Sequence, residues 1–101
     1  MVIYKGKKAV CGFQLVHDRI WRYVMSEDEN LVVEIKNAEG TLLLSKTFTS
    51  EDVDEIDKQV NVLFTPEETE SLPVGFAQIS ASLDDILVVN PQPIVIKEVV
   101  I

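Results

Sequence analysis

Apolar and polar residues alternate along most of this chain with a period of two. The clearest run is residues 31–36, where Leu31, Val33 and Ile35 occupy every second position. Successive side chains of a strand point to opposite faces, so this pattern predicts a strand with one buried face. Similar runs occupy residues 9–16, 41–48, 60–65 and 77–83. The pattern therefore predicts a protein built from many short strands.

The stretch from Val60 to Leu83 contains the one helix signal in the chain. It reads as a strand, a helical turn and a second strand. Thr65 can cap the turn, Pro66 has a preset φ at the first helical position, and Glu68 stands where a capping box needs its carboxylate. A proline and a glycine within residues 73–75 end the turn. So short a turn cannot form a helical layer, and it is expected to cross between the two sheets of a β-sandwich.

Turn signals separate the remaining strands. Val2–Tyr4 is expected to be a short edge strand, and residues 37–40 predict a hairpin loop closed by Gly40 in the left-handed conformation. The aspartate pair at residues 84–85 predicts another hairpin tip. The Asn-Pro-Gln-Pro sequence at residues 90–93 is expected to break a strand, because proline removes ladder donors.

These elements predict an all-β protein of eight or nine short strands with one short helical turn. No helix is long enough to connect parallel strands, so the sheets should be largely antiparallel, in a sandwich or barrel. The 101 residues, 47% of them hydrophobic, predict a single domain, 1–101, with one packed core. Cys11 is the only cysteine; it excludes an intrachain disulfide and is expected to point inward as a small hydrophobic side chain.

Charge excludes some partners and suggests others. A net charge of −8 argues against nucleic acid, whose phosphates require a basic surface. Residues 1–25 hold five basic residues and one acidic residue, a balance of +4, whereas residues 26–101 hold four basic and sixteen acidic, a balance of −12. This asymmetry could steer head-to-tail contacts between copies, although it also fits a soluble surface. No signal peptide and no membrane-spanning run are recognised, so we expect no membrane partner.

Candidate chemistry is sparse. The acidic residues within 51–57 lack the spacing and the glycine of a calcium loop, and a solvated loop is the preferred interpretation. His17 and Asp18 are adjacent, so their side chains would diverge on a strand; a small hydrolytic or metal-dependent enzyme would need distant carboxylates to join His17. Trp21 and Tyr23 could form an exposed aromatic platform of a carbohydrate- or receptor-binding module, or pack in the core. We expect no enzymatic activity, no cofactor and no bound metal.

A resemblance covers about residues 10–101. The Leu31–Gly40 hairpin segment, followed by the Leu63–Gly75 segment (L-F-T-P-E-E-T-E-S-L-P-V-G) and a strand with an acidic turn, resembles small immunoglobulin-like domains of tailed-phage and prophage structural proteins. The resemblance is notably to the N-terminal domain of baseplate upper proteins. The resemblance implies an immunoglobulin-like antiparallel β-sandwich with an architectural role and without catalytic residues.

The C-terminal strand supplies the candidate interface. Residues 94–101 are apolar at six of eight positions and on both faces, so Val95, Val99 and Ile101 are expected to be exposed and to bind another chain. The alternative is a central strand covered on both faces. With the resemblance, this predicts a non-enzymatic structural or assembly module of a phage or prophage tail or baseplate. It would self-associate or bind other phage structural proteins, first in the host cytoplasm and then in the virion.

Overall fold

The computed structural model of the chain describes residues 1–13, 15–17, 20–22, 28–56, 59–83 and 86–99. Ten strands and one short helix occupy these residues, so the strand count is slightly higher than the eight or nine expected. In chain order the elements are β1 (Val2–Tyr4), β2 (Ala9–Phe13), β3 (Leu15–His17), β4 (Ile20–Arg22), β5 (Asn30–Asn37), β6 (Leu42–Thr49), β7 (Asp54–Ile56), β8 (Gln59–Phe64), α1 (Pro66–Glu70), β9 (Gly75–Leu83) and β10 (Ile86–Lys97).

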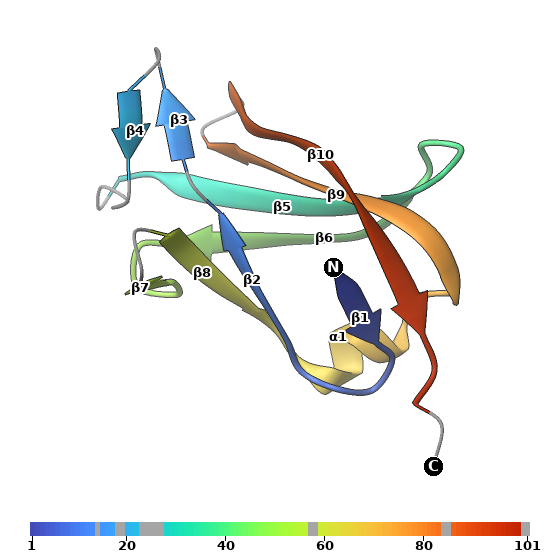
Figure 1. The fold of residues 1–101 in the computed structure, drawn as a ribbon. Coiled ribbons are helices and arrows are strands. Elements are labelled where there is room, and N and C mark those ends of the chain that lie inside the picture. The colour runs from blue at the N-terminus through green and yellow to red at the C-terminus, as the bar shows by residue number, and fades with distance from the viewer. Residues whose placement is uncertain (14, 18–19, 23–27, 57–58, 84–85, 100–101) are drawn as a thin grey trace.

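The strands form a larger sheet and a smaller sheet, with a separate hairpin (Figure 1). The larger sheet has the order β1-β10-β9-β5-β6, and the smaller has the order β2-β8-β7. β3 and β4 pair only with each other among the described strands. The all-β expectation is confirmed. Every strand pairing in the described part of the chain is antiparallel except that of β1 with β10, which is parallel.

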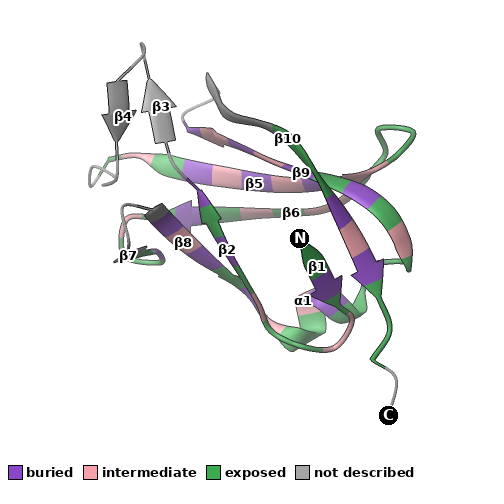
Figure 2. Cartoon of the chain, in the orientation of Figure 1, coloured by how far each residue is buried: buried purple, intermediate pink, exposed green. Residues whose placement is uncertain are grey.

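The core lies between the two sheets and is built from the alternating positions that the sequence indicated. Leu31, Val33 and Ile35 of β5 are fully buried, while the residues between them are half-buried (Figure 2). Phe48 of β6 and Phe64 of β8 join the sheets, with ring centroids 5.9 Å apart and planes at 89°. This is the edge-to-face geometry that aromatic pairs favour. The remaining buried apolar residues are Ile3, Cys11, Phe13, Val53, Val60, Val62, Leu72, Ala77, Ile79, Ala81, Leu83, Ile94 and Ile96.

The loop between β5 and β6 confirms the predicted hairpin. Asn37 Oδ1 accepts hydrogen bonds from the backbone nitrogens of Glu39 at 3.0 Å and Thr41 at 2.8 Å. The Gly40 nitrogen donates to the Asn37 carbonyl at 3.0 Å. Gly40 has a φ of 85°, a value that residues with a Cβ adopt only at a cost. The asparagine and the glycine thus set the loop together.

Helix α1 confirms the predicted capping box and carries the chain from the smaller sheet to the larger. Thr65 Oγ1 accepts from the Glu68 nitrogen at 3.3 Å, and the Thr65 nitrogen donates to Glu68 Oε1 at 2.8 Å. Thr69, fully buried, donates its hydroxyl to the Lys7 carbonyl at 2.7 Å. This bond fastens α1 to the turn between β1 and β2, and buried Leu72 packs the following turn into the core.

The predicted strand break at residues 90–93 is wrong, because β10 runs without interruption from Ile86 to Lys97. Two register shifts against β9, between Leu87 and Val89 and between Val89 and Gln92, each insert one extra residue. Such bulges tolerate proline because the extra residue is unpaired. The second bulge thus accommodates Pro91. Pro93 lies outside the bulges, in regular register opposite Gln78, and the pairing of β10 with β1 begins two residues later, at Val95.

Candidate functional site

The three residues of the candidate interface at the C-terminal strand differ in their placement. Val95 lies in β10, Val99 lies beyond the end of that strand and is 39% exposed, and Ile101 is outside the described residues. The expectation of an exposed strand edge is wrong at Val95. β1 pairs with Val95–Lys97 on one side and β9 pairs on the other. The Val95 nitrogen donates to the Met1 carbonyl at 3.0 Å, and the Lys5 nitrogen donates to the Lys97 carbonyl at 2.9 Å.

Instead of an edge, β1, β10 and β9 present an apolar patch on the outer face of the larger sheet. Ile94 and Ile96 point into the core, so Val95 between them points outward. Val2 pairs with Val95 and Val95 pairs with Phe76, which places the three side chains in one row across the sheet. Val2 is 44% exposed, Val95 is half-buried and Phe76 is 79% exposed. We call this row, together with Tyr4, the outer corner patch.

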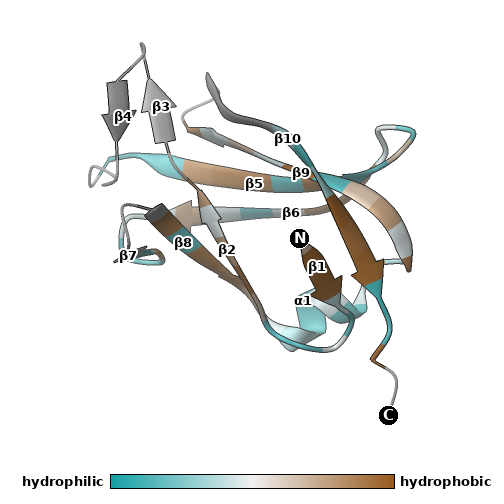
Figure 3. Cartoon of the chain, in the orientation of Figure 1, coloured by the Kyte–Doolittle hydropathy of each residue, from teal (hydrophilic) through white to brown (hydrophobic). Residues whose placement is uncertain are grey.

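Exposed apolar side chains concentrate near this patch. Nine large hydrophobic residues of the described chain are exposed, and six of them lie in or next to β1, the start of β9 and the end of β10: Met1, Val2, Tyr4, Val74, Phe76 and Val99. Figure 3 shows the high hydropathy of β1 and the adjoining part of β10. Single exposed hydrophobic residues are ordinary, whereas a contiguous group commonly marks a contact surface. Sequence reasoning missed Phe76, although the inward phase of Ala77 and Ile79 already implied that Phe76 points outward.

Beyond the patch, the outer faces of β9 and β5 are mainly polar, whereas Leu42 of β6, which pairs with Lys36, is 50% exposed. Along β9, Gln78 is exposed, and Ser80 and Ser82 are half-buried. Gln78 pairs with Lys36 of β5, and Ser80 pairs with Glu34. Polar side chains of β9 and β5 therefore border the patch on the β5 side.

A second cluster joins the two sheets at Lys46. This residue occupies an inward-facing position on β6, an edge strand, opposite buried Val33. Its Nζ donates to Glu68 Oε1 at 2.7 Å and to the Leu63 carbonyl at 3.0 Å. Nζ also lies 5.2 Å from the ring centroid of Phe48. An inward-pointing charge on an edge strand discourages pairing with another chain. We therefore interpret this cluster as structural.

The electrostatics of Glu68 agree with a structural role. Burial raises the pKa of its carboxyl, but hydrogen bonds from Lys46 and from the backbone and hydroxyl of Thr65 outweigh that effect, so the pKa lies below its ordinary value. The same carboxylate thus serves the helix cap and the ion pair with Lys46.

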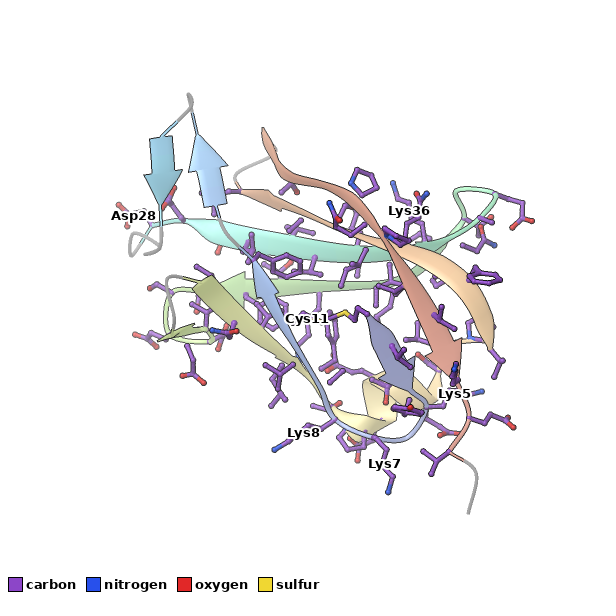
Figure 4. The ribbon with its side chains drawn as sticks, viewed as in Figure 1. Lys5, Lys7, Lys8, Cys11, Asp28 and Lys36 are labelled. Atoms are coloured by element: carbon purple, nitrogen blue, oxygen red, sulfur yellow. The ribbon has the colours of Figure 1, made fainter. Side chains whose placement is uncertain are left out.

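Candidate reactive groups show no converging geometry in the described part of the chain. Cys11 on β2 points toward β1, with Sγ 3.8 Å from Met1 Sδ (Figure 4). Burial raises the pKa of its thiol to about 11, which keeps it protonated and unreactive near neutral pH. Among the described residues, no three His, Cys, Asp or Glu side chains come close enough to hold a metal ion. His17 lies in β3, and its side chain is outside the described set.

The acidic segment at residues 51–57 contains the start of a strand. Glu51, Asp52 and Asp54 are exposed, as a solvated loop requires, but β7 begins within the segment. Asp52 Oδ2 accepts from both the nitrogen and the hydroxyl of Thr49, each at 3.0 Å. These hydrogen bonds hold the pKa of Asp52 below its ordinary value. The carboxylate therefore stabilises the turn after β6.

Two open hollows are too small to indicate a ligand pocket. One of about 230 Å³ is lined by Lys5, Glu70, Glu98 and Val99. Another of about 230 Å³ is lined by Lys46, Thr47, Phe48, Asp52 and Leu63. Pockets for small molecules usually enclose about 300–1,000 Å³ with mainly apolar walls.

The predicted aromatic platform at Trp21 and Tyr23 stays a prediction. The Trp21 backbone lies in β4 and pairs with Val16, while its side chain and all of Tyr23 lie outside the described residues. No helix in the described part of the chain is long and apolar enough to span a membrane.

Comparisons with known proteins identify no family for the chain. No family model matches it, no curated protein matches its sequence, and no solved structure matches its fold.

Proposed function

We propose that this chain is a non-enzymatic structural or assembly module that acts through protein–protein contacts. The observation that carries the proposal is the outer corner patch, whose most exposed residue, Phe76, is 79% exposed. Burying one such ring removes about 150–250 Å² of apolar surface from water, which favours association. The patch stands on paired strands rather than on a loop, so a partner meets a preformed surface.

We further propose that the fold is immunoglobulin-like. The order β2-β8-β7 corresponds to strands B, E and D of that fold, and β10-β9-β5-β6 corresponds to G, F, C and C′. Helix α1 then lies at the crossover from E to F. β1 adds a strand parallel to β10, and the β3–β4 hairpin is an insertion between B and C. The strand order supports the resemblance noted from the sequence.

The particle assignment is the most specific level of the proposal. It places the chain in a tailed-phage or prophage particle, at the tail or baseplate, after synthesis in the host cytoplasm. Its support is the similarity of the Leu63–Gly75 segment to phage structural domains, together with a fold and a patch suited to an architectural role.

Mass spectrometry of purified particles tests this assignment. Particles from the strain that encodes the chain should contain it at a fixed stoichiometry to other tail proteins. Phe76→Ser should deplete the chain from particles, whereas Val10→Ser should not, because Val10 is 57% exposed on the smaller sheet, away from the patch. Absence of the wild-type chain from particles contradicts the particle role. Equal incorporation of both folded variants contradicts the patch as the contact surface.

A further inference from the structure

We draw no further inference here: the strongest candidate, the outer corner patch on the outer face of the larger sheet, carries nothing beyond the proposed function, because nothing in the structure shows what covers it.

Discussion

At the residue scale, the buried hydroxyl of Thr69 has the clearest role. It donates to the Lys7 carbonyl at 2.7 Å and ties α1 to the turn between β1 and β2. Thr69→Val keeps the shape but leaves that carbonyl without this partner, so the free energy of unfolding should fall by about 1–3 kcal/mol. Ser71→Ala is the control: this exposed hydroxyl donates to the Glu68 carbonyl, and its loss should cost about 0.5 kcal/mol or less. Urea denaturation curves separate the two, and equal midpoints would contradict the role of Thr69.

The lowered pKa of Glu68 predicts that the free energy of unfolding depends on pH. Its pKa is lower in the folded protein than in the unfolded chain, so its ionised form stabilises the fold above the unfolded pKa. That contribution is lost as the pH falls through the folded pKa. Glu68→Gln keeps a capping side chain but removes the charge that meets Lys46. We expect the variant to be less stable by about 0.2–1 kcal/mol at pH 7, since the pair is partly exposed.

Urea denaturation curves at several pH values test this predicted pH dependence. The difference between wild type and Glu68→Gln should shrink as the pH falls below the ordinary glutamate range. Glu67→Gln, at the neighbouring exposed position, controls for the loss of one acidic charge in the first turn of α1. A difference that is constant from pH 7 to pH 3 would contradict the role of ionised Glu68.

At the element scale, the β5–β6 hairpin depends on its loop backbone. Gly40 has a φ of 85°, and nothing lies within 4 Å of the position that a Cβ would take. Gly40→Val therefore tests backbone strain without a steric clash, and it should destabilise the fold by about 1–3 kcal/mol. Glu39→Val places the same side chain at the adjacent exposed position and controls for added apolar surface. If Glu39→Val unfolds at a lower temperature than Gly40→Val, the backbone strain at Gly40 is unimportant.

The sequence predicted the elements whose cause is local. The capping box at Thr65 and Glu68 and the loop at Asn37 and Gly40 each depend on side chains within four residues, and both are present. The course of β10 was missed because proline was weighed as a lost donor. Whether a donor is needed depends on the pairing with β9, which directly precedes β10, and with β1, which is distant in sequence. The parallel pairing of β1 was missed because its partner, β10, lies at the other end of the chain.

The candidate site was predicted only in part. An exposed apolar surface near the C-terminal strand was expected from composition, and Val95 lies in the outer corner patch. The form of the outer corner patch as a sheet face depends on which strands lie beside β10. β9 directly precedes β10, but β1 comes from the start of the chain, so the pattern of β10 alone does not encode the patch.

At the scale of the whole molecule, the fold depends on how the two sheets meet. Phe48 from the larger sheet and Phe64 from the smaller are both buried, in edge-to-face contact at 5.9 Å, with Lys46 Nζ near both rings. A contact of this kind contributes about 0.5–1.5 kcal/mol beyond the area it buries. The two rings should therefore be energetically coupled, although 15 residues of chain separate them.

A double-mutant cycle measures this coupling. Phe48→Leu and Phe64→Leu should each destabilise the protein, and the double variant should lose less than their sum by about 0.5–1.5 kcal/mol, because the edge-to-face contact can be lost only once. Val10 provides the matched reference, since it is exposed on the outer side of β2 and points away from the core. Phe48→Leu and Val10→Ala should be additive to within about 0.5 kcal/mol. Additivity of the two phenylalanine substitutions as well would contradict an energetic coupling between the sheets through these two rings.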